Sequence, residues 1–262
     1  MVAKSKLKMS EFFLELFSEE IPANLQINAR KNLLQNFENL LNENDISKKS
    51  KLKVISTPNR LVINIEKIKN IIVKKSEEIR GPSVEAPKKA LEGFIRSNKI
   101  NKNQVFKKKT EKGDFYFFKK PTNKIKTVDL LAENIPKILD KISWSKSMKW
   151  GNYNLFWGRP LKSILAIFDG KKIDFNFHHL KSSNFTYIDK DFEEKTKIFS
   201  SFKLYNSYFK SIGVIIDHEK RKLFISNELK KLSTKKKLNI DLNEKLLEEI
   251  TNIVEKPKIL FC

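Results

Sequence analysis

The chain has 262 residues, is 40% hydrophobic with 20 Phe, and carries 53 Lys and Arg against 31 Asp and Glu, a net charge of +22. This length and apolar content support a folded protein with its own core, and a single cysteine, Cys262, excludes disulfides within the chain. No apolar run approaches the roughly 20 residues of a membrane span, and the basic start lacks the apolar segment of a signal peptide, so we expect a cytoplasmic protein with no membrane partner.

The sequence from residue 10 to residue 70 predicts a β-α-β-β module, preceded by a basic disordered leader over residues 1–9. Apolar residues alternate along Phe12–Phe17, which is the period of a strand, and recur at helical spacing over Asn24–Leu41. Two further runs of alternating residues, on either side of a turn at Thr57–Arg60, predict a pair of strands.

Residues 71–198 predict an α+β region with hairpins. Lys74–Lys89 shows no clear period and is predicted as a surface loop, and Thr127 is a plausible N-cap for the helix that follows it. The pair Asp169-Gly170, flanked by apolar runs, is the strongest hairpin signal in the chain.

Residues 199–262 predict a helical region. Phe202–Ile212 has helical spacing, Asp217 can cap a second helix, and Asp241 can cap a third that runs to Val254. The predicted fold class is therefore α+β, with mixed or antiparallel sheet hairpins, helices, and a helix-rich C-terminal third.

The basic excess and an aromatic segment both raise the possibility of nucleic-acid binding. A charge of +22 attracts polyanions. The abundance of Lys, Asn, Ile and Phe is also what AT-rich codons favour, and in that case most of the lysines are solvated surface residues. Trp144, Trp150 and Trp157 lie among basic side chains, and such rings can stack on unpaired bases. Large aromatics also dominate cores, and we favour that interpretation for these rings.

The sequence predicts no catalytic residue, no metal site and no cofactor bound by this chain. Glycines are scattered and form no phosphate-binding loop, and His178, His179 and His218 lack further ligands at suitable spacing. Glu19 and Glu20 could form an acid–base pair, but an acidic cluster just before a helix is the better interpretation because it favours the helix dipole.

Seven segments, in order, resemble the glycyl-tRNA synthetase beta subunit family. They are residues 14–22 (LELFSEEIP, similar to LLEIGTEELP), 56–61 (STPNRL, ATPRRL), 80–82 with 89–94 (RGP and KALEGF, the latter similar to KAAEGF), 112–114 (KGD, KGE), 148–151 (MKWG, MRWG), 159–165 (RPxxxIL) and 247–257 (LEEITNIVEKP, LLEEVTxLVEWP). Any one match is weak, but seven in the right order and spacing make coincidence very improbable.

The chain departs from the family pattern in three places. Residues 182–188 stand where the family usually has a GHRF segment, so a role tied to that motif is in doubt, and Asn59 replaces the first Arg of the RR pair. The family's chains also continue much further, into a metal-type helical domain and an anticodon-binding domain, so this chain resembles an N-terminal portion.

The resemblance implies a subunit that binds and positions tRNA(Gly) without a catalytic site of its own. In this family an alpha subunit makes glycyl-adenylate from glycine and ATP, so ATP and Mg belong to that partner, and the two subunits form an alpha2-beta2 heterotetramer in the cytoplasm. The predicted RNA-binding residues are Arg60, Arg80, Lys149 and Arg159, which lie in family-like turns or loops. Surface or interface salt bridges are an equally good interpretation of these cations.

Three other functions stay open at the level of sequence. The chain could be a noncatalytic assembly module for the alpha subunit, or a generic basic RNA-binding protein for which the motif series is accidental. A hydrolytic editing domain ranks last, because only analogy of fold suggests it and no residue set supports hydrolysis.

Overall fold

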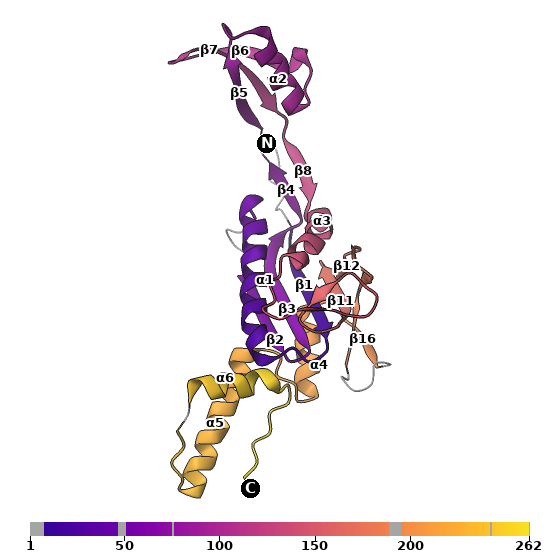
Figure 1. Ribbon diagram of the computed structural model, residues 1–262, viewed down its shortest axis with the longest axis vertical. Coiled ribbons are helices and arrows are strands. Elements are labelled where there is room, and N and C mark those ends of the chain that lie inside the picture. The colour runs from indigo at the N-terminus through magenta and orange to yellow at the C-terminus, as the bar shows by residue number, and fades with distance from the viewer. Residues whose placement is uncertain (1–7, 47–50, 75, 189–194, 242, 262) are drawn as a thin grey trace. The chain divides into compact units, whose positions relative to one another are not determined.

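The computed structural model describes residues 8–46, 51–74, 76–188, 195–241 and 243–261 (Figure 1). The predicted leader falls largely on residues 1–7, outside the described residues, but Met9 already belongs to the first strand, so the leader prediction is wrong for that residue. The chain divides into two compact units: a main unit of residues 1–70 and 126–262, and an inserted unit of residues 71–125. The α+β fold class is confirmed.

The main unit is built on one mixed sheet, and its described strands lie in the order β13-β14-β11-β1-β3-β2 with β12 paired to β11. All neighbouring strands are antiparallel except β11 and β14. The strands are β1 (Met9–Ser18), β2 (Lys51–Thr57), β3 (Arg60–Lys69), β11 (Leu161–Phe168), β12 (Lys171–Lys172), β13 (Asn176–Phe177) and β14 (Leu180–Ser183). The order β1-α1-β2-β3 confirms the predicted β-α-β-β module.

The central strand β1 is buried on both faces, as the nearly continuous apolar run from Phe12 to Phe17 requires. On one face Phe12 lies 5.5 Å, between ring centroids, from Phe37 of helix α1 (Ala23–Glu43), which also contacts α3 (Thr127–Asp140). On the other face Phe13 lies 4.8 Å from Tyr205 of α4 (Phe202–Ser211). Glu15, two residues further along the strand, therefore points to the same side as Phe13, towards α4.

Two predicted helix caps differ from the structure. Thr127 is the first residue of α3, and its hydroxyl donates to the Lys69 carbonyl, so it ties the helix to β3 instead of capping it. Asp217 caps α5 (His218–Lys236) as predicted, but α6 (Glu244–Ile253) is capped by Asn243, whose side chain accepts from two backbone amides of the first turn. Asp241 stands two residues before this cap.

The Asp169-Gly170 hairpin is confirmed. Both residues have positive φ, 53° and 78°, as the tight hairpin turn between β11 and β12 requires. Asp169 also accepts hydrogen bonds from Ser10 (2.8 Å) and Asn70 (3.3 Å), so the turn is tied to the end of the β1–β3 pair where β1 begins and β3 finishes.

The inserted unit contains a three-stranded antiparallel sheet, β5-β7-β6, and helix α2 (Lys88–Asn98) beside it (Figure 1). Its strands are β5 (Glu77–Ser83), β6 (Val105–Thr110) and β7 (Gly113–Lys120), and a separate pair joins β4 (Ile71–Lys74) to β8 (Asn123–Lys126). The surface loop predicted over Lys74–Lys89 is wrong for the segment that forms β5. This edge strand turns only Ile79 toward an apolar partner, Phe118, and so lacks the alternation that marks a strand.

None of the helices in the described part of the chain is long and apolar enough to cross a lipid bilayer.

His218, at the start of α5, predicts a pH dependence of stability. Burial, with Arg30 nearby, lowers the pKa of His218 from 6.5 to about 4, although Asp217 acts in the opposite direction. Because the unfolded chain binds this proton more tightly, the stabilising contribution is complete above pH 6.5 and is lost as the pH falls through 6.5 towards 4. At about 1.4 kcal/mol per pH unit this window corresponds to roughly 3 kcal/mol of unfolding free energy, and solvent screening of the partly exposed ring reduces the expected loss to roughly 2 kcal/mol.

The measurement is urea denaturation of the wild type and a His218→Gln variant at pH 7.5 and pH 4.5. Because many carboxylates also titrate in this range, the informative quantity is the difference between the two proteins. The variant should lose less stability on acidification, and an identical loss in both proteins would contradict the assignment to His218.

Candidate functional site

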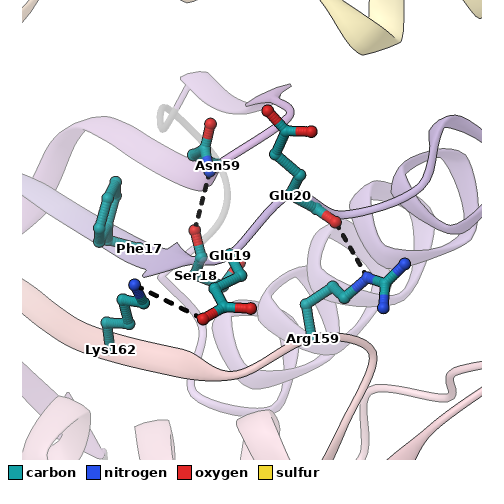
Figure 2. A pocket seen from close by; sticks show the side chains of 7 residues that line it. All are labelled: Phe17, Ser18, Glu19, Glu20, Asn59, Arg159 and Lys162. Atoms are coloured by element: carbon teal, nitrogen blue, oxygen red, sulfur yellow. Dashed lines mark hydrogen bonds and ion pairs between the residues drawn. The ribbon is translucent and has the colours of Figure 1, made fainter. Parts of the chain in front are cut away.

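Three segments that resemble the family meet at one end of the neighbouring strands β11, β1 and β3 (Figure 2). They are the end of β1 with the residues after it, the turn between β2 and β3, and the residues leading into β11. Backbone hydrogen bonds hold them together: Ser18 N donates to Asn59 O (2.9 Å), and Glu19 N donates to Pro160 O (3.0 Å). A third backbone hydrogen bond, from Ile21 N to the Pro58 carbonyl, also holds the β2–β3 turn. These motifs therefore form one local structure.

A cavity of about 360 Å³ opens where the segments meet. Its lining residues are Phe17, Ser18, Glu19, Glu20, Asn59, Arg159 and Lys162. Arg159 Nε donates to the Glu20 carbonyl (3.1 Å), and Lys162 Nζ lies 3.6 Å from a carboxylate oxygen of Glu19. Figure 2 shows that the two terminal nitrogens of Arg159 extend away from the carbonyl that its Nε binds.

The chemistry of this cavity is that of a binding site. It presents hydrogen-bond donors on Arg159 and Lys162 and acceptors on Glu19, and it contains no nucleophile paired with a base. In the part of the chain that the structure describes, no group of three or more His, Cys, Asp or Glu side chains could hold a metal ion. The arrangement can orient a charged or polar partner but offers no covalent chemistry.

Arg60, the first of the predicted RNA-binding residues, is buried. Its side chain is 1% exposed, and Nη1 lies 3.2 Å from a carboxylate oxygen of Glu15, which is fully buried. The guanidinium also donates to the Tyr187 carbonyl (2.8 Å) and lies over the rings of Phe17 and Phe209, 4.6 and 4.5 Å from their centroids. In this structure the guanidinium of Arg60 presents no surface to RNA, and its contacts are internal.

The Glu15–Arg60 pair is embedded in further polar contacts. The hydroxyls of Thr186 and Tyr205 both donate to the Glu15 carboxylate, and Glu255 lies 3.8 Å from Arg60 Nε. Burial raises the pKa of Glu15, while Arg60 acts in the opposite direction. Burial alone would lower the pKa of Arg60, but the Glu15 carboxylate raises it, so the guanidinium stays charged.

The C-terminal family-like segment returns to the same region. Thr57, in the turn that carries Arg60, donates its hydroxyl to Glu255, and Gln26 of α1 donates to the Asn252 carbonyl (2.6 Å). Arg221 of α5 joins the parts, because it donates to the carbonyls of Ser56 and Thr251 at 3.0 and 2.8 Å. Sequence reasoning missed Arg221 and Gln26, since neither lies in a recognisable motif.

Lys149 lies on β9 (Met148–Lys149), which pairs with β10 (Phe156–Trp157), and it is exposed. Trp157 is 2% exposed and its ring lies 5.0 Å from that of Trp144, so the expectation that these rings are core is confirmed for Trp157. Gly158 is required here, because a Cβ at this position would lie 2.5 Å from the Trp144 ring. Lys149 is not among the residues that line the cavity.

The adjacent histidines His178 and His179 contact different partners. His178 and His179 lie in the turn after β13 instead of on a strand, and His178 has a positive φ of 50°. His178 contacts Asp140 (3.0 Å), whereas His179 stacks on Tyr153 with ring centroids 3.6 Å apart.

The predicted cations are thus distributed over different surroundings. Arg159 and the turn before Arg60 meet at the cavity, Lys149 lies on a neighbouring hairpin, and Arg80 belongs to the inserted unit. Arg80 is exposed, and its guanidinium carbon lies 3.5 Å from the centroid of the Phe115 ring. The four residues do not form one binding surface, because the side chain of Arg60 is buried.

Comparison with known proteins agrees with the resemblance of the motifs. The sequence pattern of the glycyl-tRNA synthetase beta subunit matches residues 12–262. The glycine–tRNA ligase beta subunits of Rickettsia prowazekii and Rickettsia conorii are 37% and 36% identical over 252 residues, which is 96% of this chain. The chain spans 38% of the length of these relatives. The match over nearly all of the chain shows that it belongs to the glycyl-tRNA synthetase beta subunit family.

Proposed function

We propose that this chain binds tRNA(Gly) and positions it for glycylation by an alpha subunit, as part of a glycine–tRNA ligase. The complete reaction would join glycine to tRNA with conversion of ATP to AMP and pyrophosphate. ATP and Mg would bind to the alpha subunit, and two copies of each subunit would form a cytoplasmic heterotetramer. This chain would supply no catalytic residue.

The observation that carries the proposal is the convergence of family-like segments on a cavity with an exposed arginine. Arg159 is anchored through Nε to a backbone carbonyl, which fixes the side chain while the rest of the guanidinium extends away from that carbonyl (Figure 2). A net charge of +22 adds a general attraction for a polyanion as large as tRNA. Contacts to phosphates orient a nucleic acid without reading its sequence, which suits a positioning subunit.

The experiment that tests the proposal compares binding of this chain to glycine tRNA and to an unrelated tRNA at two salt concentrations. A preference for glycine tRNA that survives near-physiological salt would place recognition in this chain. Equal binding that salt abolishes would reduce its role to electrostatic capture. No binding to either tRNA at low salt would overturn the proposal.

Substitution of Arg159 by alanine is expected to weaken tRNA binding severalfold and to reduce the slope of log affinity against log salt by about 0.9, the value for one lost phosphate contact. The fold should be intact because the side chain is exposed. Arg80→Ala and Lys149→Ala are expected to weaken binding in the same direction.

The matched control is Lys137→Ala, which removes one positive charge from an exposed face of α3, where the lysine is paired with Glu133 at 2.7 Å. Its effect on tRNA affinity should be markedly smaller than that of Arg159→Ala. If all these substitutions lower the affinity equally, only the net charge matters and the assignment of Arg159 is wrong.

A second candidate function is assembly with the alpha subunit, and exposed apolar side chains on the C-terminal helices favour it. Leu223 of α5 is 61% exposed, and Leu246 and Ile253 of α6 are 55% and 57% exposed. Ile253 also lines a cavity of about 640 Å³ between α6 and the start of α1. Copurification with the alpha subunit in the absence of RNA, and its loss in an Ile253→Asp variant, would support this role.

A further inference from the structure

The three-stranded sheet of the inserted unit has one face covered by α2. Phe118 of β7 points to this side, where its ring centroid lies 6.4 Å from that of Phe94. Gly81 brings the helix close, since a Cβ there would lie 2.9 Å from the Phe94 ring. Because side chains alternate along a strand, the neighbours of Phe118 on β7 point to the opposite face.

The opposite face carries aromatic rings and cations together. The strand register places Phe106 and Arg80 on either side of Phe117, and places Lys108 beside Phe115. Phe106 stacks on Phe117 with ring centroids 6.2 Å apart and planes 25° from parallel. No described helix or strand of the inserted unit covers this face, which we name the open face and define by these five residues.

The open face is accessible and its cations lie against the rings. Phe106 is 38% exposed, Phe115 is partly exposed, and Phe117 is nearly covered by its neighbours. The Arg80 guanidinium stacks 3.5 Å above the Phe115 ring, and Lys108 Nζ lies 5.6 Å from the centroid of Phe117. A guanidinium stacked on a ring presents a second flat, positively charged surface of the kind on which a base can lie.

The charge of the inserted unit indicates what kind of partner this face suits. Residues 71–125 contain fifteen Lys and Arg against six Asp and Glu. A purely apolar partner would desolvate the two cations of this face, Arg80 and Lys108, whereas a nucleotide supplies a flat base for the rings and a phosphate for the cations. Paired bases in a duplex have no free ring face to offer.

We propose that the open face of the inserted unit is a stacking platform for unpaired RNA nucleotides, with Phe106 and the Arg80–Phe115 pair as its two stacking surfaces. The proposal rests on the proposed function, because tRNA is the RNA that would supply such nucleotides at its unpaired 3′ end or in its loops. It assigns to the inserted unit a role distinct from phosphate contacts in the main unit, which position a tRNA but do not require free bases.

The test measures binding of the full chain to a labelled single-stranded RNA of about eight nucleotides and to a duplex of the same composition. Phe106→Ala is expected to lower the affinity for the single strand about tenfold and to leave the affinity for the duplex nearly unchanged. Phe106→Leu keeps an apolar side chain over Phe117 and removes the flat ring, so it should lower the single-strand affinity without disturbing the sheet. Hydrogen exchange of β6 and β7 amides checks that the sheet is intact.

Arginine substitutions provide a matched pair. Arg80→Gln removes a charge from the open face, and Arg96→Gln removes the same charge from exposed α2. We expect the first to weaken single-strand binding more than the second. As an independent readout, 5-iodouracil in the bound single strand should crosslink to Phe106 or Phe115 on irradiation.

The proposal is overturned if both Phe106 variants bind the single strand as tightly as the wild type, or if affinity for strand and duplex falls equally, which would indicate simple attraction of phosphates. Glycine tRNA binding, measured on the same preparations, separates this result from failure of the proposed function. Wild-type binding to glycine tRNA with no effect at Phe106 removes the platform alone. Absence of tRNA binding removes the proposed function, whatever the short RNAs do.

Discussion

Replacing Glu15 with alanine is expected to lower the free energy of unfolding by about 3–5 kcal/mol. The substitution removes the carboxylate that lies 3.2 Å from Arg60 and leaves a guanidinium that is 1% exposed. The remaining contacts of Arg60 include the Tyr187 carbonyl, the Thr186 hydroxyl at 3.2 Å, two aromatic rings and Glu255 at 3.8 Å, which do not replace a direct ion pair. The hydroxyl of Tyr205 also loses its acceptor.

The two partners of this pair are expected to respond differently to removal of the other. Arg60→Met leaves a buried carboxyl group, and burial already raises the pKa of Glu15, so that group can become neutral by binding a proton. An arginine has no such route near neutral pH. Arg60→Met should therefore cost less than Glu15→Ala, and its cost should diminish as the pH is lowered towards the raised pKa of Glu15.

Urea denaturation followed by tryptophan fluorescence measures these effects, because all three tryptophans lie in the main unit. The control is the double variant Glu15→Leu with Arg60→Met, which replaces both charges by apolar groups and should recover most of the lost stability. A loss below about 1 kcal/mol for Glu15→Ala would show that the pair behaves like an exposed one and would contradict its assignment as a buried pair.

Local periodicity was sufficient to predict the helices and strands whose own residues show a clear apolar period. The alternation along Phe12–Phe17 predicted a strand, which the structure confirms, and the structure adds that both faces are buried, with Phe12 against α1 and Phe13 against α4. Strand β5 was missed because an edge strand needs only one inward apolar residue, which leaves no period to detect. The cap of α6 was misplaced because Asn243 and Asp241 are both good capping residues, and only the backbone geometry decides between them.

The candidate site was harder to predict than the helices and strands, because it is formed by contacts between residues that are distant in the sequence. The motifs predicted that Arg159 and the turn before Arg60 are important, and the structure brings their segments together at one cavity. The burial of Arg60 could not be predicted from its turn, because its partner Glu15 is 45 residues away in the sequence. The usable signal was Glu15 itself, a charged residue within an apolar strand, which calls for a buried partner.

Replacing Arg221 with methionine is expected to cost about 3–4 kcal/mol and to release the C-terminal helices from the sheet. Arg221 is fully buried and donates to four backbone carbonyls: those of Ser56 in β2, Ile215 and Ile216 before α5, and Thr251 in α6, at 3.0, 2.5, 3.2 and 2.8 Å. Burial lowers the pKa of Arg221 to about 10, so the side chain is still charged at neutral pH. Methionine has similar length but no donor, and all four carbonyls would lose a partner.

Lys222→Met is the matched control, because it removes the neighbouring charge from the same helix. Lys222 forms an ion pair with the exposed Glu244 at 2.7 Å and is itself partly exposed, so its loss should cost below about 1 kcal/mol. Hydrogen exchange distinguishes the local effect from global destabilisation. In the Arg221→Met variant, amides of α5 and α6 should exchange faster, while those of β1 and β3 at the centre of the sheet keep more of their protection. Uniform loss of protection across the main unit would instead show that the helices and the sheet unfold as one, and that Arg221 stabilises the whole unit and not the attachment of its C-terminal helices.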